Sequence, residues 1–120
     1  MIVVGVGLQE GATTEALRDA VAGLDLPEVD VVATVDARAS HPAVVALAVG
    51  RTLRCYPSEA LAEVGVPAPS GRVERLAGTA SVAEAAALLA AREHDPAARL
   101  VVGKTVGVGV TVAAASCDGS

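Results

Sequence analysis

The sequence predicts an α/β fold, a three-layer α/β/α sandwich on a mostly parallel, mixed sheet. Two observations lead to this fold class. Short β-branched runs alternate with segments whose apolar residues recur at helical spacing, and the last two apolar runs follow one another with only a glycine-rich segment between them. Alternating strands and helices favour parallel pairing, whereas two consecutive strands favour an antiparallel pair.

Length and composition indicate one small domain with a core of small side chains. The chain has 120 residues, 52% of them apolar, and Tyr56 is its only aromatic residue. At this length roughly two thirds of the unfolded surface can be buried, so no disulfide is required. The core must therefore be assembled from Val, Leu and Ala. We expect a single domain over residues 1–115 and a polar tail over 116–120.

The charge balance and the cysteines exclude several classes of protein. Fourteen acidic and nine basic residues give a net charge of −5, and no basic run is present, so a nucleic-acid partner is not expected.

No apolar run approaches the ~20 residues of a membrane helix, and the N-terminus does not have the pattern of a signal peptide. We expect a cytoplasmic protein with no membrane partner. Cys55 and Cys117 have no metal-ligand spacing and are expected to be reduced thiols, with no metal or cofactor.

The first half of the chain predicts a β-α-β-α-β order. The runs 2–6 and 31–35 are typical of strands buried on both faces, and a shorter strand is expected over 52–56. A helix over 14–24 follows Thr13, a favourable N-cap residue. An almost wholly apolar helix over 41–49 follows, with Ser40 as its expected cap and Gly50 as its stop.

The second half predicts two helices, a loop and two strands. A brief helix begins at Ser58, and the dense prolines and glycines of 65–71 predict an irregular loop. The S-x-x-E pattern at Ser81 predicts the start of a helix that ends near Arg92. The final strands are expected over 100–102 and 108–115, separated by the segment 103–107.

Glycines after the first strand form the first candidate for a site. In open α/β sheets ligands bind outside the carboxyl ends of the strands. Gly5, Gly7 and Gly11 resemble a dinucleotide fingerprint, but Glu10 stands where the last glycine belongs, and its carboxylate would repel a pyrophosphate. Three alternatives stay open: glycines that serve only a turn, a nucleotide site, or a loop whose bare backbone approaches a different ligand.

The exit of the second strand is the second candidate. Thr34, Asp36 and Arg38 could orient a polar ligand, with Asp36 holding the guanidinium in place, or they could simply cap and solvate the entrance of the next helix. Ser40, His41 and Asp36 also suggest a hydrolase triad. That interpretation is disfavoured because the chain has no G-x-S-x-G elbow and the adjacent Ser and His have poor geometry.

Lys104 is the third candidate. It is the only lysine beside eight arginines, and it follows the predicted strand 100–102 next to flexible glycines. A compact ammonium group at a strand end suits a carboxylate or phosphate ligand, although strand ends also carry solvated lysines.

Several segments occur in a fixed order along the chain: Val4-Gly5-Val6-Gly7 with Gly11, Ala33-Thr34-Val35-Asp36, Pro67-Ala68-Pro69-Ser70 with Val73 and Gly78, Ser81-Val82-Ala83-Glu84-Ala85-Ala86, Lys104, and Val110-Thr111-Val112-Ala113. Together they resemble the CobE family, whose domain also forms the C-terminus of CbiG; both belong to cobalamin biosynthesis. The likeness spans nearly the whole chain. Each segment is weakly specific, but their common order and spacing are specific together.

The resemblance implies a three-layer α/β fold and a corrin or precorrin ligand, with other enzymes of the pathway as possible partners. CobE-type proteins are short separate chains thought to bind corrin intermediates, whereas CbiG-type proteins open the δ-lactone of cobalt-precorrin-5A and release acetaldehyde. The ligand-binding residues expected on this basis are Gly5, Gly7, Gly11, Thr34, Asp36, Arg38, Ser70 and Lys104.

Departures from the family pattern reduce the positive charge available for a polycarboxylate. Leu8 and Gln9 stand where the family often has Cys and Arg, and Val106 replaces the second residue of a basic pair. Three hypotheses follow: a binding protein for a corrin or precorrin intermediate, part of a cobalt-precorrin-5A hydrolase, or a nucleotide-binding half-domain.

Overall fold

The structure, a computed structural model, describes residues 1–62, 64 and 81–117. Its elements in chain order are β1 (Ile2–Leu8), α1 (Thr14–Ala22), β2 (Val31–Val35), the 3-10 helix η1 (Asp36–Arg38), α2 (Pro42–Leu47), β3 (Thr52–Tyr56), α3 (Ser58–Ala62), α5 (Ser81–Arg92), β4 (Arg99–Val106) and β5 (Val110–Ser116). The loop predicted over 65–71 lies outside the described residues.

The described strands form one five-stranded sheet in the order β3-β2-β1-β5-β4. β1 pairs in parallel with β2, and β2 pairs in parallel with β3. β5 is antiparallel to both β1 and β4. The predicted α/β class and mixed sheet are confirmed, but only two of the four pairings are parallel, because β5 returns from β4 through a hairpin and lies antiparallel between β4 and β1.

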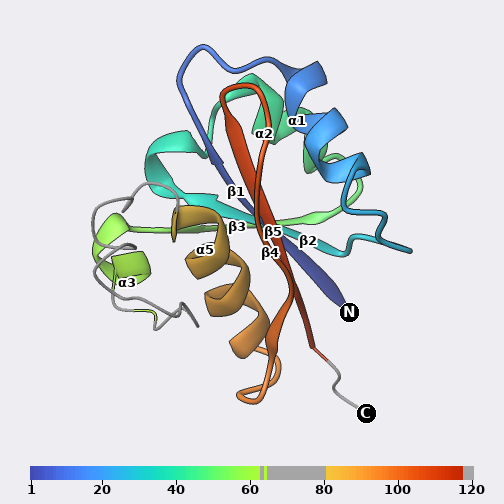
Figure 1. Ribbon diagram of the computed structural model, residues 1–120. Helices are drawn as coiled ribbons and strands as arrows, with labels where there is room; N and C mark the ends of the chain where they lie inside the picture. Colours follow the sequence, from blue (N-terminus) through green and yellow to red (C-terminus); the bar gives the residue numbers. More distant parts are fainter. Residues whose placement is uncertain (63, 65–80, 118–120) are drawn as a thin grey trace.

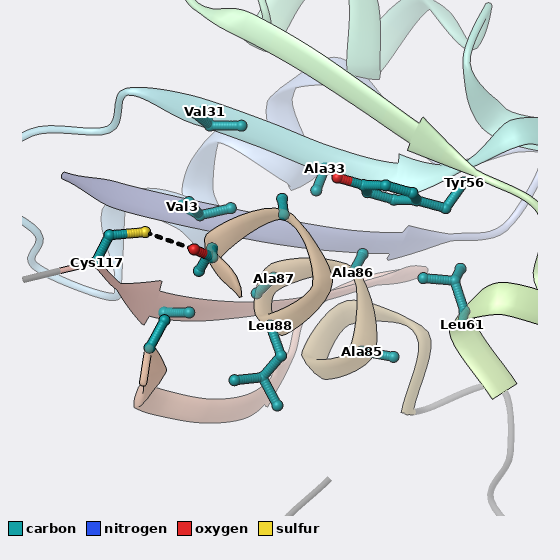
Figure 2. Close-up of a cluster of buried hydrophobic side chains, with 14 residues drawn as sticks. Val3, Val31, Ala33, Tyr56, Leu61, Ala85, Ala86, Ala87, Leu88 and Cys117 are labelled. Carbon is teal, nitrogen blue, oxygen red and sulfur yellow. Dashed lines mark hydrogen bonds between the residues drawn. The ribbon is translucent and has the colours of Figure 1, made fainter. Parts of the chain in front are cut away.

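Helices cover both faces of the sheet, which gives the predicted three layers (Figure 1). On one face α1 and α2 pack against Val4 and Val6 of β1, and Leu17 of α1 is fully buried there. On the other face α5 and α3 cover Val3 of β1 and the ring of Tyr56 (Figure 2). The alternation of side chains along a strand sends neighbouring residues of β1 into the two separate cores.

Gly5, at the centre of β1, lets α5 lie directly on the sheet. A Cβ atom at Gly5 would overlap the carbonyl oxygen of Ala83 and would lie 2.7 Å from the amide nitrogen of Ala87. The face that α5 turns to the sheet consists of small buried residues, namely Ala83, Ala86, Ala87, Ala90 and Ala91. The helix backbone therefore rests on the strand backbone, at a separation that no larger residue at position 5 would allow.

The final hairpin differs from the predicted one. The segment 103–107 was expected to separate two strands, but β4 continues through it to Val106 with two register shifts against β5. Bulges of this kind let a strand bend without ending. The turn is confined to Val108 and Gly109, and Gly109 has a φ of +72°, which glycine adopts without strain.

The start of α2 also differs from the prediction. Thr13 caps α1 as expected, since its Oγ1 accepts a hydrogen bond from the amide of Ala16 at 3.0 Å. In α2, however, the cap is His41 and not Ser40: Nδ1 of His41 accepts from the amide of Ala43 at 3.1 Å. Pro42 occupies the first helical position, where its missing N–H is not needed.

The C-terminal strand extends beyond the boundary expected at residue 115. β5 runs to Ser116, and the amide of Cys117 donates to the carbonyl of Met1 at 2.9 Å. The buried thiol of Cys117 donates to the carbonyl of Ala91 at 3.0 Å (Figure 2). Burial raises the pKa of this thiol, so the side chain of Cys117, which follows β5, stays protonated and packs against the C-terminal end of α5.

No helix in the described part of the chain is long and apolar enough to cross a membrane.

Replacing Gly5 by Ala should destabilise the fold by about 3 kcal/mol, because the added methyl group pushes the backbone of α5 off the sheet. Gly11→Ala is the matched control: no atom lies within 4 Å of a Cβ at that position, so a change below ~0.5 kcal/mol is expected. Urea unfolding of the two variants measures both values. Equal midpoints for the two variants would contradict the close packing of α5.

The single tyrosine gives a second test of the core. Tyr56 is 9% exposed, and its hydroxyl makes no hydrogen bond within the described residues. Burial raises its pKa to about 12; the nearby Glu93 acts in the same direction and the nearby Arg54 in the opposite one. The unfolded chain, with an ordinary pKa of 10.0, loses the proton first, so the free energy of unfolding should fall as pH rises from about 10 to about 12.

Absorbance at 295 nm reports this ionisation directly, since no other tyrosine contributes. We expect a midpoint near pH 12 in the folded protein and near pH 10 in denaturant. Tyr56→Phe should be as stable as the parent chain or more stable at pH 7, because it removes an unpaired buried hydroxyl, and it should lack the tyrosine contribution to the alkaline loss. A midpoint near 10 in the folded protein would show that the ring is solvated.

Candidate functional site

A cavity of about 580 Å³ opens at the carboxyl ends of β1 and β2. The β4–β5 hairpin and the first turn of α5 complete its walls. It is lined by Gly7, Leu8, Gln9, Val35, Ala37, Arg38, Val82, Val106, Gly107, Gly109, Val110 and Thr111. We refer to it as the carboxyl-end cavity.

The topology explains why a cavity forms at this place. The helices that follow β1 and β2 cover one face of the sheet, whereas α5, which precedes β4, covers the other. The chain therefore diverges to opposite faces beside β1, and a crevice remains at the ends of the strands between these connections. Crevices at such switch points are the usual ligand sites of open α/β sheets.

Among the described residues that line the carboxyl-end cavity, Arg38 is the only charged one. Its Nε donates to the carbonyl of Leu8 at 2.9 Å, which fixes the guanidinium at the mouth of β1. Within the described residues its two terminal nitrogens have no protein partner and can bind a carboxylate in two-pronged fashion. The predicted role of Asp36 in holding Arg38 is wrong, because the Leu8 carbonyl holds it and no ion pair to Asp36 occurs.

Apolar residues form the other side of the cavity. Val35 and Val82 line it from β2 and α5, and Val106 lines it from the end of β4. Val106 is 69% exposed and Val108, at the tip of the hairpin, is 84% exposed. The cavity thus combines one cation with an apolar lip that extends into solvent.

The N-terminus of α5 adds a weak positive potential. Val82, in the first turn of this 12-residue helix, lines the cavity and would lie 3.5 Å from a Cβ atom at Gly7. The partial positive charge at a helix N-terminus favours anionic groups nearby. It acts here in the same sense as the guanidinium of Arg38.

The three predicted glycines lie in different surroundings. Gly7 lines the cavity, but Gly5 is buried under α5, and Gly11 is exposed in the loop after β1. Gly5 and Gly7 belong to an extended strand and do not form a turn, because β1 continues to Leu8 and pairs with β5 along its whole length. The spacing that resembled a nucleotide fingerprint therefore does not build a phosphate-binding loop.

The residues at the exit of β2 are also divided. Thr34 is fully buried, and its hydroxyl donates to the carbonyl of Val6 at 2.8 Å, so it joins two strands and does not reach the cavity. Asp36 begins η1 and is exposed, and its carbonyl accepts from the amide of Ala39. Arg38 is the residue of this group that lines the cavity. Ser70 lies outside the described residues.

Lys104 lies in the edge strand β4 and not at a strand end. It is exposed, two residues before Val106, and it is not among the residues that line the cavity. Its amide donates to Oε2 of Glu84 in α5 at 3.2 Å. A lysine beside bulges on an edge strand is a common protection against unwanted strand pairing, which is a sufficient structural reason for its position.

The sequence pointed to the loop after β1 through Gly11, but it did not single out Gln9 or the hairpin glycines as parts of the site. Gly107 and Gly109 line the cavity, and the carbonyl of Gly109 accepts from the amide of Gln9 at 2.9 Å. Residues a hundred positions apart meet there because β5 is inserted beside β1. The one local signal was Gly109 itself, a glycine after Val108 between two apolar runs, which is typical of a hairpin turn.

A second cavity, of about 630 Å³, lies at the amino ends of the strands and has several charged residues in its lining. It is lined by Met1, Asp30, Val31, Thr52, Arg54, Glu93 and His94. Arg54 and Glu93 form an ion pair there. Asp30 accepts from the amide of Ile2 at 3.0 Å. The carboxylates of this amino-end cavity make it a poor host for an anionic ligand.

Comparison with known proteins now decides the family. The profile of the family described as cobalamin synthesis G C-terminus matches residues 2–115. The chain belongs to this family. No sequence among the curated proteins matches it significantly.

Solved structures agree with the family assignment. The chain is similar to CobE, a protein from the cobalamin (vitamin B12) biosynthetic pathway, with a TM-score of 0.76 and 28% identity over 96% of this chain and 89% of the other. It is also similar to the cobalamin biosynthesis protein chiG from Agrobacterium tumefaciens str. C58, with a TM-score of 0.65 and 28% identity over 98% and 99% of the two chains. The protein is thus a cobalamin biosynthesis protein related to CobE and to the C-terminal domain of CbiG.

A longer relative shares the fold. A cobalamin biosynthesis protein G homologue from Sulfolobus solfataricus matches with a TM-score of 0.73 and 20% identity over 99% of this chain but only 37% of the other. The cobalamin synthesis G C-terminal fold thus also occurs as one part of a larger protein.

Proposed function

We propose that this protein binds a corrin or precorrin intermediate of cobalamin biosynthesis in the carboxyl-end cavity and does not itself transform it. Precorrins carry acetate and propionate arms around an apolar macrocycle, so a binder needs a cation for the arms and an apolar surface for the ring. The carboxyl-end cavity supplies Arg38 on one side and Val106 on the other. The proposal rests on this combination of an apolar lip with a guanidinium that has no acidic neighbour among the described lining residues.

Comparison of the two cavities supports this choice of site. The amino-end cavity is the larger, but Asp30 and Glu93 line it, and its guanidinium, that of Arg54, is already paired with Glu93. A polycarboxylate placed there would meet two carboxylates. In the carboxyl-end cavity the described lining residues include no acid. The net charge of −5 opposes such a ligand only weakly, because physiological salt screens charges beyond ~8 Å.

The hydrolase alternative rests on the likeness to the G-type proteins. In this alternative Glu10 or Asp36 acts as the general base and Lys104 contacts the developing oxyanion. None of these three residues lines the cavity. The pKa of Cys55 is raised by burial and by Asp36, and the pKa of Cys117 is raised by burial, so neither thiol is activated as a nucleophile. The nucleotide alternative loses its motif, since Gly5 and Gly7 belong to a strand and only Gly11 lies in the loop after it.

The first test is a titration with hydrogenobyrinic acid followed by its visible bands. We expect binding in the micromolar range, and Arg38→Ala should weaken it about tenfold, since a charged hydrogen bond contributes roughly 1.5 to 3 kcal/mol. Arg99→Ala removes one positive charge from the other end of β4 and serves as the matched control. Thermal unfolding confirms that both variants are folded.

Lys104→Ala completes this series. Because Lys104 lies outside the cavity lining, its loss should weaken binding less than the loss of Arg38 does. No spectral change at tens of micromolar protein would remove the proposal, and equal losses in Arg38→Ala and Arg99→Ala would move the site away from this cavity.

The second test separates binding from catalysis. Incubated with cobalt-precorrin-5A, the protein should release no acetaldehyde above the background without protein, although it binds the compound. Steady acetaldehyde release, lost in Asp36→Asn, would establish the hydrolase alternative.

A further inference from the structure

The loop between β1 and α1 forms part of the wall of the carboxyl-end cavity, and side chains from outside the loop hold it in place. Gln9, Glu10 and Gly11 are all exposed, and Gln9 lines the cavity. Two backbone bonds shape the loop: the amide of Gln9 donates to Gly109, and the amide of Ala12 donates to Gln9 at 3.1 Å. The position of the loop therefore also depends on hydrogen bonds from side chains outside it.

His41 supplies one of these tethers. Its Nε2 lies 2.9 Å from the carbonyl oxygen of Glu10, and its Nδ1 lies 3.1 Å from the amide nitrogen of Ala43 at the start of α2. One half-buried imidazole thus joins the loop after β1 to the helix that follows β2. The guanidinium of Arg38 makes the adjacent bond to Leu8, so both contacts fix the exit of β1.

The two partners determine the protonation of the ring. A backbone amide can only donate, so Nδ1 must be the bare, accepting nitrogen; a carbonyl can only accept, so Nε2 must carry the hydrogen. The neutral Nε2–H tautomer alone satisfies both bonds. The bond from Nε2 to Glu10 has no role in capping α2. Its effect is on the loop after β1.

We propose that His41 is a positioning residue for the carboxyl-end cavity. By donating from Nε2 to the Glu10 carbonyl, it holds the loop after β1 in the conformation in which Gln9 lines the cavity, and it raises ligand affinity without contacting the ligand. This inference rests on the proposed function for its effect on affinity. Its effect on the loop is independent of any ligand.

Two substitutions separate the two bonds of His41. Asn places its side-chain oxygen near the position of Nδ1 and is a strong N-cap residue, but it is too short to reach Glu10. Gln is longer and places its amide donor near the position of Nε2, so it can keep the tether while capping poorly. Ser40→Ala is the matched control, because Ser40 is exposed and takes no part in the cap.

The experiment measures three quantities for each variant: the melting temperature, amide exchange at Gln9 and Ala12, and affinity for hydrogenobyrinic acid. His41→Asn should keep the parent melting temperature, exchange about fivefold faster at these amides and bind about fivefold more weakly, the effect expected of one partly exposed hydrogen bond. His41→Gln should melt lower but recover most of the lost affinity. Ser40→Ala should match the parent chain in all three.

The outcomes distinguish this inference from the proposed function. If the parent chain binds the probe and His41→Asn binds equally well, the positioning role is overturned and the binding function stands. If the parent chain does not bind, the proposed function fails, and exchange in His41→Asn still decides whether the tether exists. Nitrogen chemical shifts of the imidazole give a further check, since an Nδ1–H tautomer would contradict the geometry.

Discussion

The backbone of α5 lies directly on β1 at Gly5, and this close contact sets the position of the helix on the sheet. The helix backbone touches the strand backbone at this residue, and a row of alanines on α5 makes such an approach possible. Because α5 crosses the sheet at this point, its first turn comes beside Gly7 at the end of β1. A larger residue at position 5 would displace that turn and change the wall of the carboxyl-end cavity. The glycine is therefore needed for packing, and it acts on the site only through the helix.

The insertion of β5 beside β1 has a comparable effect on the cavity. It brings a hairpin from the end of the chain against the loop after the first strand, where Gln9 and Gly109 share a hydrogen bond. The β4–β5 hairpin thus forms one wall of the cavity, and Arg38 forms another. In a protein with a single aromatic residue, this arrangement builds an apolar surface from valines and glycines. A flat, apolar macrocycle with carboxylate arms has matching chemistry.

The sequence predicted the strands and most helices because periodicity and caps are local properties. It also selected Gly7 and Arg38, which line the carboxyl-end cavity, since strand exits are favoured positions for ligand sites. It did not predict the hairpin walls, which depend on how β5 pairs a hundred residues away. It placed Lys104 at a strand end because the bulges that prolong β4 leave no clear local signal. It assigned the cap of α2 to Ser40, a statistically favoured residue, whereas Nδ1 of His41 makes the capping bond and Nε2 of the same ring contacts Glu10.

A ligand in the carboxyl-end cavity should perturb the backbone amides that line it. Amide chemical shifts recorded during a titration with hydrogenobyrinic acid test this placement residue by residue. We expect the largest shift changes at Gly7, Gln9 and Gly109 and no change at Thr52 and His94. Shifts concentrated at Thr52 and His94, around the amino-end cavity, would contradict it.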